Sequence, residues 1–437
     1  MLTIIVLERK EVEDYQSVFF LNPMMIFNNN QQEALDKIKR FLESNDSCFL
    51  LAGYSGTGKT TLAKEISTFK KPIFLTPTNA ALKRLREKIE NDKLTFSTIH
   101  SYLFQPKEDE KGLKFRGVSG LLPSLYIIDE CSMIDKFILE YLLNNKASKT
   151  KIIFLGDNFQ LPPVGDNPEI FKWDKSNYSH HFKEHNKHIL TEVVRYDGEI
   201  LRIATEIRTK QSLNFSYIKS EDFVIKSKFS SHIATCVNNF ENFIIICATN
   251  KQRLFYNNGI RKFKYKELAK EPINEGETLI SISNNTNFVN GDSYYVGSFS
   301  IISDFQFRLK TELVRAVLIQ HNGILTFLLP EIEQASFSLM YFAKNPMLLT
   351  QELRDMLLIY NNKYQSYNVN NNVVVATYGY ATSCHKSQGN EWDYVFVDSS
   401  QMFFKQDNPK WFYTAITRAK KKVEVICPGW MNIKLKT

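Results

Sequence analysis

The sequence predicts an α/β protein made of two parallel sheets flanked by helices, in which each unit carries an insert. Short, almost continuously apolar runs alternate with amphipathic helical segments over 27–195. This alternation is typical of strands that are buried on both faces of a parallel sheet. The same pattern returns after 195 and again from 372 onward, while the stretches between break it. The chain is therefore expected to hold two α/β domains and two inserts.

Each element of the first unit follows from its own segment. Helices are expected to begin at Thr60, after a glycine-rich loop, and at Asn79. The apolar runs that predict the strands are SCFLLA (47–52), PIFLTP (72–77), SLYIIDE (124–130) and KIIFLGD (151–157). In the second unit the corresponding runs are NFIIICATN (242–250), NVVVATYGY (372–380), WDYVFVD (392–398) and KKVEVICP (421–428).

The breaks in this pattern give the domain boundaries. Residues 1–26 precede the first motif and stay unassigned. Short alternating strands such as SYYVGSFSII indicate that the second insert is rich in β structure. The expected division is a first domain over 27–100 and 125–195, an insert over 101–124, a second domain over 196–266 and 372–437, and a β-rich insert over 267–371.

Composition sets broad limits on function. The chain has 437 residues and a formal net charge of +8, a modest basic excess that suits a nucleic-acid partner but is weak evidence alone. Its six cysteines are scattered, which excludes a zinc or disulfide framework and favours a reducing compartment. The first apolar run is too short for a signal peptide, and no stretch could span a membrane. A cytoplasmic location is expected, including a host cytoplasm if the gene belongs to a phage.

The stretch GYSGTGKT (53–60) fits the phosphate-binding loop pattern GxxxxGK[ST], between an apolar strand and a helix. Its glycines let backbone N–H groups point at phosphates, Lys59 supplies a charge to the β and γ phosphates, and Thr60 offers a hydroxyl to Mg²⁺. ATP and Mg²⁺ are therefore the expected cofactors. The nucleotide-binding residues expected here are Gly53, Ser55, Gly56, Thr57, Gly58, Lys59, Thr60 and Thr61.

Two carboxylates close the strand SLYII. Asp129 is expected to hold Mg²⁺ through water, and Glu130 to act as the general base that polarises the attacking water. Adjacent carboxylates at this place favour hydrolysis over transfer to a metabolite; a plain surface pair is the alternative. In KIIFLGDNFQLPPVG (151–165), Gln160 is expected to touch the γ-phosphate and that water. The stiff Pro162-Pro163 pair either transmits a nucleotide-dependent shift or simply makes a rigid loop.

These segments, in this order, resemble the superfamily 1 helicases of the RecD/Dda-like branch over about residues 27–427. The resemblance implies RecA-like domains with ATP in the cleft between them. Gln31 matches the family's adenine-reading glutamine, and Arg195 in LTEVVRY its arginine-finger position. Gly389 and Glu391 belong to the matching fifth motif, and Arg418 in WFYTAITRAKK to the sixth. A surface salt bridge is the alternative for both arginines.

The resemblance also implies that single-stranded DNA crosses both domains opposite the ATP cleft. Phe115 in LKFRG (113–117) is expected to be the wedge that splits the duplex, with packing against the first domain as an equal alternative. The β-rich insert matches the family's SH3-like domain in position only. The strand-contacting residues implied by the resemblance are Pro77, Thr78, Asn79, Thr98, His100, Thr382 and His385.

The expected function is an ATP-dependent DNA helicase that moves 5′ to 3′ in replication, recombination or repair. Single-stranded and forked duplex DNA are the expected partners, with a single-strand-binding or replication protein as a further candidate, and the chain is expected to act as a monomer. The alternatives are a DNA-loading or remodelling factor without strand separation, an RNA-directed helicase, or a P-loop kinase. The segment HHFKEHNKH (180–188) is expected to be a solvated loop or helix, not a metal site.

Overall fold

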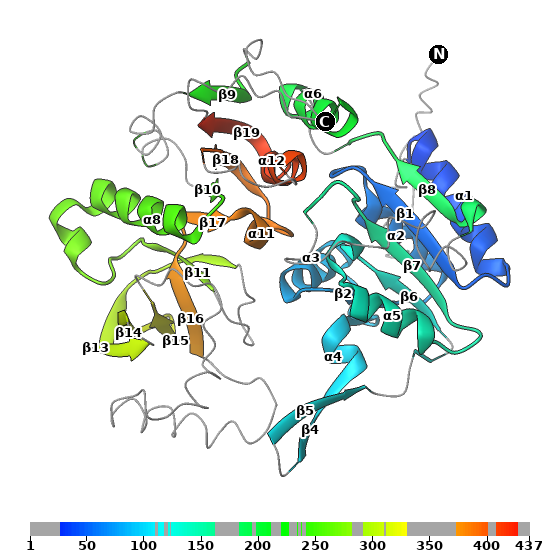
Figure 1. Cartoon of the computed structure of the whole chain (residues 1–437), viewed down its shortest axis with the longest axis horizontal. Coiled ribbons are helices and arrows are strands. Elements are labelled where there is room, and N and C mark those ends of the chain that lie inside the picture. The colour runs from blue at the N-terminus through cyan, green and yellow to red at the C-terminus, as the bar shows by residue number, and fades with distance from the viewer. Residues whose placement is uncertain are drawn as a thin grey trace, which may run out of the picture.

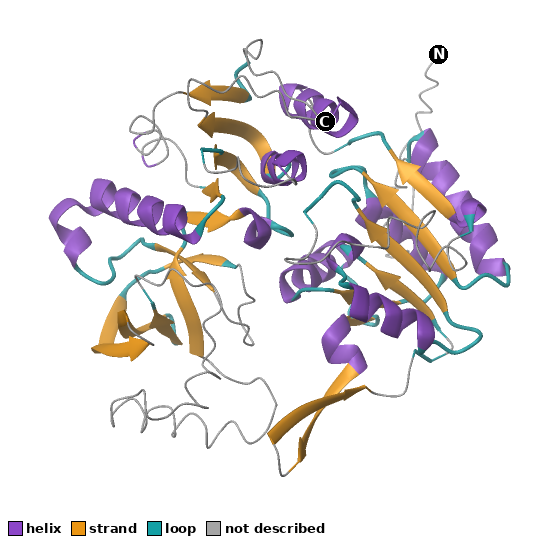
Figure 2. Ribbon diagram, viewed as in Figure 1, coloured by secondary structure: helices purple, strands orange, loops and turns teal. Residues whose placement is uncertain are grey.

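The structure of the chain is a computed structural model, shown in Figures 1 and 2. It describes residues 27–109, 112–117, 121–122, 124–161, 183–194, 198–210, 220–226, 234, 237, 242–281, 292–309, 312–329, 373–400 and 408–426. The unassigned segment 1–26 lies outside the described residues. Figure 1 shows one group of strands and helices from α1 to β8 and a second group from α6 to β19, with further strands beside the second.

The first α/β unit is a sheet of six parallel strands in the order β3-β2-β6-β7-β1-β8. The strands are β1 (Cys48–Gly53), β2 (Ile73–Thr76), β3 (Thr95–Thr98), β6 (Leu125–Ile128), β7 (Lys151–Gly156) and β8 (Lys187–Leu190). The helices α1 (Asn29–Glu43), α2 (Lys59–Phe69) and α3 (Asn79–Ile89) cover one face. The helices α4 (Ile99–Leu103) and α5 (Lys136–Asn144), with the short helix η1 (Cys131–Met133), cover the other.

The strand β1 explains why the apolar runs are continuous. Successive side chains of a strand point to opposite faces. Leu50 therefore packs with α4 and α5, and Leu51 packs with α1 to α3, and both are completely buried. Each such side chain contributes about 1.5–3 kcal/mol by leaving water. The parallel sheets flanked by helices confirm the predicted α/β fold class.

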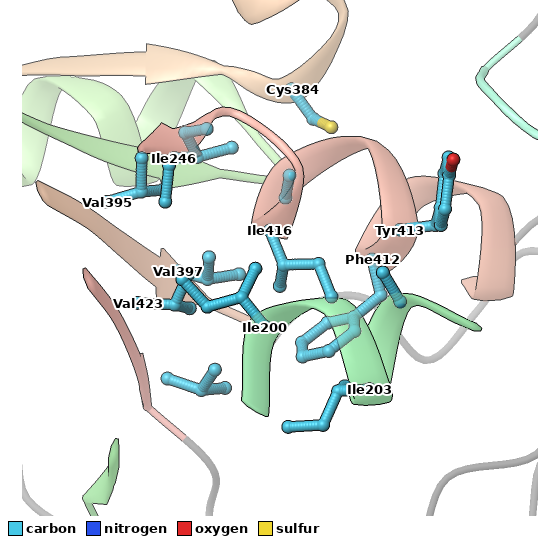
Figure 3. Packing of buried hydrophobic residues seen from close by; sticks show 14 of the residues in the cluster. Ile200, Ile203, Ile246, Cys384, Val395, Val397, Phe412, Tyr413, Ile416 and Val423 are labelled. Atoms are coloured by element: carbon cyan, nitrogen blue, oxygen red, sulfur yellow. The ribbon is translucent and has the colours of Figure 1, made fainter. Parts of the chain in front are cut away.

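The second α/β unit has five parallel strands in the order β17-β10-β18-β19-β9. They are β9 (Phe223–Lys226), β10 (Phe243–Cys247), β17 (Ala381–Ser383), β18 (Trp392–Asp398) and β19 (Ala419–Ile426). On one face, α6 (Gly198–Lys210) and α12 (Asn408–Ile416) pack against the sheet: Figure 3 shows Ile203 and Phe412 among the buried side chains there. The helix α8 (Asn250–Tyr265), followed by η6 (Lys266–Lys270), packs on the other face, and α11 (Cys384–Ser387) follows β17.

The β-rich insert is a six-stranded sheet in the order β12-β11-β16-β15-β14-β13, antiparallel except between β15 and β16. Its strands are β11 (Thr278–Ser281), β12 (Ser293–Tyr295), β13 (Phe299–Leu309), β14 (Glu312–His321), β15 (Ile324–Leu328) and β16 (Val373–Tyr378). One boundary is corrected, because β16 was expected in the second α/β unit. The apolar run VVVATY is suited to a buried strand of either sheet. The pattern of apolar residues indicates a buried strand but does not indicate which sheet the strand joins. The SH3-like character of the insert stays a prediction.

The first unit also carries a two-stranded antiparallel ribbon. Its strands are β4 (Phe104–Asp109) and β5 (Gly112–Gly117), which follow α4 directly. The ribbon projects away from both units in Figure 1. Phe115 lies on β5, opposite Pro106, but its side chain is outside what the structure describes.

The histidine-rich segment differs from its expectation where the structure describes it. The helix η4 (Glu184–Asn186) leads into β8 at the edge of the first sheet. His188 is buried there, and its ring nitrogen lies 3.1 Å from the carbonyl oxygen of Asn30. Tertiary contacts of this kind let a polar segment form a strand. Among the described residues, no group of three or more histidine, cysteine or acidic side chains is arranged to hold a metal ion, and no helix is long and apolar enough to cross a membrane.

Gly379 joins β16 to β17, and hence the insert to the second unit. A Cβ at this position would lie 2.8 Å from the backbone carbon of Leu279, which cannot move like a side chain. We expect Gly379→Ala to destabilise the fold by about 1–3 kcal/mol and to lower the melting temperature by several degrees. Gly297→Ala is the matched control, because its nearest neighbour would be 3.7 Å away. Equal melting temperatures of the two variants would contradict this reading.

Candidate functional site

The phosphate loop lies between β1 and α2. Gly56 and Gly58 have φ angles of 81° and 84°, in the left-handed region that favours glycine. A Cβ at Gly58 would lie 2.5 Å from Nε2 of Gln31. Gly58 is the N-cap of α2 and has no side chain, so no capping side chain covers the positive end of that helix. The loop therefore has the backbone geometry of an anion site.

Gln31 lies behind this loop rather than in the pocket. It belongs to the capping box of α1, where its Oε1 accepts from the Asn28 N–H at 3.1 Å. Its Nε2 donates to the carbonyl oxygen of Thr57 at 3.1 Å. Gln31 thus connects the start of α1 to the phosphate loop, and it is not among the residues that line the pocket.

Three side chains around the loop are placed by local contacts. The ammonium group of Lys59 donates to the carbonyl oxygens of Gly53 and Tyr54, at 2.9 and 2.8 Å. The hydroxyl of Thr60 donates to Oδ2 of Asp129 at 3.3 Å. Burial raises the pKa of Asp129, and so does the negative charge of the next residue, against a smaller opposing effect of Lys59. The site thus holds a carboxylate whose charge is costly without a cation.

Glu130 has an unusual backbone conformation. Its φ and ψ angles are 54° and 40°, in the left-handed region where residues other than glycine are uncommon. Such a conformation costs on the order of 1–3 kcal/mol. The Glu130 N–H donates to Oδ1 of Asp129 at 2.9 Å, which helps to hold the turn. Both residues line the same pocket.

One pocket gathers residues from both α/β units. The predicted Lys59, Asp129 and Gln160 reach it from the first unit, and Glu391 and Arg418 reach it from the second. The complete lining is Ser55, Gly56, Thr57, Gly58, Lys59, Thr60, Thr61, Ala81, Arg84, Leu85, Lys88, Asp129, Glu130, Gln160, Glu391 and Arg418. Arg195 lies outside the described residues.

The position of Gln160 is fixed by hydrogen bonds to the backbone of the next residue, Leu161. The N–H of Leu161 donates to the hydroxyl of Thr414 at 3.0 Å, and its carbonyl oxygen accepts from Gln388 at 2.8 Å. Both partners belong to the second unit. The Oε1 atom of Gln160 is buried and, among the described residues, has no hydrogen-bond partner. This side chain therefore brings an unused acceptor to the pocket.

Arg418 follows the C-terminal end of α12. Its side chain is buried, and its Nε donates to the carbonyl oxygen of Thr414 at 3.0 Å. A second guanidinium nitrogen donates to the Thr417 hydroxyl at 3.2 Å. These two bonds fix the direction of the guanidinium at the pocket.

Two cations of the pocket were missed by the sequence analysis, namely Arg84 and Lys88 on α3. A guanidinium nitrogen of Arg84 lies 4.0 Å from Oε1 of Glu391, so it faces the second unit. Gly389 has a φ angle of 86°, and a Cβ there would lie 2.8 Å from Arg84. The signal in the sequence was the spacing of Ala81, Arg84 and Lys88, which places them on one helix face.

The predicted strand-contacting residues of the first unit lie at one edge of its sheet. Thr78 caps α3 by accepting from the Ala81 N–H at 3.2 Å. Thr98 caps α4 in the same way on the neighbouring strand. Pro77 and Asn79 flank Thr78, and His100 is exposed beside the Phe104 ring, 5.8 Å between centroids.

The second unit repeats this arrangement. The strands β10 and β17 are neighbours, with Thr382 on β17 and His385 in α11. Thr249 caps α8 after β10, and Asn250 is the first residue of that helix. These two residues were not predicted as strand contacts. The signal was the match between PTN at 77–79 and ATN at 248–250, each at the end of a strand.

The fold and the pocket define a P-loop nucleotide-binding protein whose site is completed by a second α/β unit. An AAA domain family matches residues 27–227, and the UvrD-like helicase C-terminal domain matches 378–426. Across 98% of this chain and 78% of the relative, the sequence is 25% identical to the RecBCD enzyme subunit RecD of Buchnera aphidicola. It is 32% identical to the ATP-dependent DNA helicase dda of Enterobacteria phage T4, over 41% and 42% of the two chains.

The fold itself is shared with a solved structure, Bacteroides Pif1 bound to ssDNA. The TM-score is 0.50 at 17% identity, over 93% of each chain. These matches, together with the order of the motifs, support a superfamily 1 helicase similar to RecD and Dda.

The raised pKa of Asp129 gives a prediction about stability. An acid whose pKa is higher in the folded chain binds its proton more tightly there, so its ionisation weakens folding as pH rises through that range. We expect Asp129→Asn to melt at a higher temperature than the wild type at pH 8 without added metal. The difference should shrink as the pH falls toward 5. A lower melting temperature of the variant at pH 8 would contradict the cost assigned to this carboxylate.

Proposed function

We propose that the chain hydrolyses ATP and uses the cycle to move 5′ to 3′ along single-stranded DNA and to unwind duplex. The observation that carries this proposal is the composition of the pocket. Lys59 and Asp129 of the first unit line the same pocket as Arg418 of the second. Because each unit supplies part of the catalytic site, the rate of hydrolysis depends on how the two units are arranged relative to each other.

Each pocket residue has a role that fits its placement. Lys59 meets the β and γ phosphates, Gln160 orients the attacking water with its unused acceptor, and Glu130 accepts the proton of that water. Arg418 stabilises the charge that develops on the phosphoryl group. Arg195 remains a second candidate for that role.

The oxygen atoms of Thr60 and Asp129 are ligands that suit Mg²⁺, Asp129 through water. The raised pKa of Asp129 agrees with a site that is completed by a cation. Mg²⁺ would neutralise phosphate charge when bound.

The contacts between the first unit and the rest of the chain suit a motor that opens and closes. The ammonium group of Lys83 lies 2.7 Å from Asp292 of the insert, and Arg84 faces Glu391. An exposed ion pair such as Lys83–Asp292 stabilises the contact by only about 0–1 kcal/mol, so it is easily broken and formed again.

Single-stranded DNA would lie along the carboxyl edges of both sheets. Thr78 and Thr98 in one unit, and Thr249 and Thr382 in the other, are suited to phosphate oxygens. DNA as the substrate is supported by the name of the T4 relative, and the polarity by the resemblance to the RecD branch. A role in replication, recombination or repair follows from the same resemblance.

Lys59→Ala should lower ATP hydrolysis by at least about 100-fold, because it removes the charge that meets the phosphates. Binding of single-stranded DNA should remain, and phosphate release by the wild type should need no small-molecule acceptor. Lys64→Ala is the control, since Lys64 lies on the same helix and pairs with exposed Glu90. Full hydrolysis by Lys59→Ala would overturn the assignment of the site.

The motor is tested by strand displacement on forked duplexes with a 5′ or a 3′ tail, in DNA and in RNA. We expect displacement only with the 5′ DNA tail. Phe115→Ala should lose displacement but keep DNA-stimulated hydrolysis, while Phe69→Ala, at an exposed phenylalanine of α2, should keep both. Activity only on the 3′ tail would reverse the polarity, and unchanged displacement by Phe115→Ala would place the wedge elsewhere.

A further inference from the structure

A buried ion pair lies behind the phosphate loop, outside the pocket. Asp157 directly follows β7 and is completely buried, and Arg208, near the end of α6, pairs with its carboxylate. The guanidinium of Arg208 also lies 4.0 Å from the centroid of the Tyr54 ring, in the phosphate loop. An ion pair away from water is held firmly, because loss of one partner leaves an uncompensated charge.

Tyr413 connects this pair to the phosphate loop. Its hydroxyl donates to Oδ2 of Asp157 at 2.7 Å and accepts from the backbone N–H of Ser55 at 3.0 Å. Its ring packs edge-to-face against Phe159, with centroids 5.3 Å apart. Tyr413 is buried on α12, the helix that Arg418 follows. One hydroxyl therefore links the phosphate loop, the end of β7 and the helix that presents Arg418.

We propose that Tyr413 and the Arg208–Asp157 pair are positioning residues that hold Arg418 in register with the phosphate loop. This inference rests on the proposed function. None of the three residues lines the pocket, as far as the structure describes it. They should therefore govern the rate of ATP turnover and leave the binding of nucleotide almost unchanged.

The arrangement needs Asp157 to be ionised. Burial acts to raise the pKa of its carboxyl, but the charges of Arg208 and Lys59, and hydrogen bonds from Arg208 and Tyr413, outweigh it and lower that pKa. Among the described residues, these groups come from three elements: Arg208 from α6, Lys59 from α2 and Tyr413 from α12, with the Tyr54 ring stacked against the guanidinium of Arg208. Without the positive charge of Arg208, the effect of burial on the pKa of Asp157 is opposed less strongly. The pKa should therefore be higher, and Asp157 should take up a proton more easily.

The first test is Tyr413→Phe, which keeps the ring and removes the hydroxyl. We expect kcat of DNA-stimulated ATP hydrolysis to fall about tenfold or more, because small errors of alignment are costly in catalysis. KM for ATP, and the affinity for a fluorescent ADP analogue, should change by less than about twofold. Tyr265→Phe is the matched control, because that hydroxyl contacts Tyr380, away from the pocket.

The second test compares Arg208→Gln with Arg208→Lys. In Arg208→Gln, kcat should fall as the pH drops from 8 to 6, while the wild type should keep a flatter profile over that range. Arg208→Lys should restore the flatter profile, since it returns the charge. Arg202→Gln on the same helix is the control, because Arg202 is exposed and pairs with Glu199 and Glu206. A merely structural role for Arg208 would not move the pH profile.

The outcomes separate this inference from the proposed function. A wild type that hydrolyses no ATP, with or without DNA, would end the proposed function. An active wild type with unchanged kcat in Tyr413→Phe, or equal losses of kcat and nucleotide affinity, would overturn the inference. An Arg208→Gln profile parallel to that of the wild type would also overturn it. If Tyr413→Phe does not fold, the two Arg208 variants decide the question.

Discussion

The backbone of Leu161 is the contact on which the site depends. Its N–H and carbonyl group are both bound by side chains of the second unit, Thr414 and Gln388. Gln160 is the preceding residue, and Thr414 also accepts from Arg418 through its carbonyl oxygen. Each hydrogen bond of this kind is worth a net of about 0.5–1.5 kcal/mol. The two units are therefore joined with defined geometry by bonds that are individually weak enough to break and form again.

The chemistry of the pocket also explains why it is not optimised for stability. Asp129 is a buried carboxylate beside a second one, and Glu130 has a strained backbone conformation. Both features cost free energy in the folded chain, and both place an acidic group where a phosphate and its cation are expected. Lys59, Arg84 and Arg418 provide the opposite charge around the same space. A nucleotide with its metal would relieve part of this cost, which couples binding to the arrangement of the two units.

Local patterns made much of the architecture predictable. Strands such as β1 and β7 are buried on both faces, so their apolar runs stand out, and the phosphate loop is recognised because its residues are contiguous. Other elements depend on distant partners. The strand β8 contains His188, whose burial is possible because Asn30 of α1 meets its ring. Arg208 and Asp157 are 51 residues apart, and no local pattern in the sequence indicates their contact. Strand β16 was assigned to the wrong sheet because both sheets bury apolar runs.

The helix α3 is a rigid element that joins the pocket to one of the proposed DNA contacts. It begins at the Thr78 cap, where the strand of nucleic acid is proposed to bind, and it carries Arg84 and Lys88 into the pocket. A helix of 11 residues is about 16 Å long, so these two places are joined by a single stiff element. In the second unit, α11 after β17 leads within a few residues to Glu391 at the same pocket. A small rotation of one unit relative to the other must therefore change the pocket and the proposed DNA contacts together.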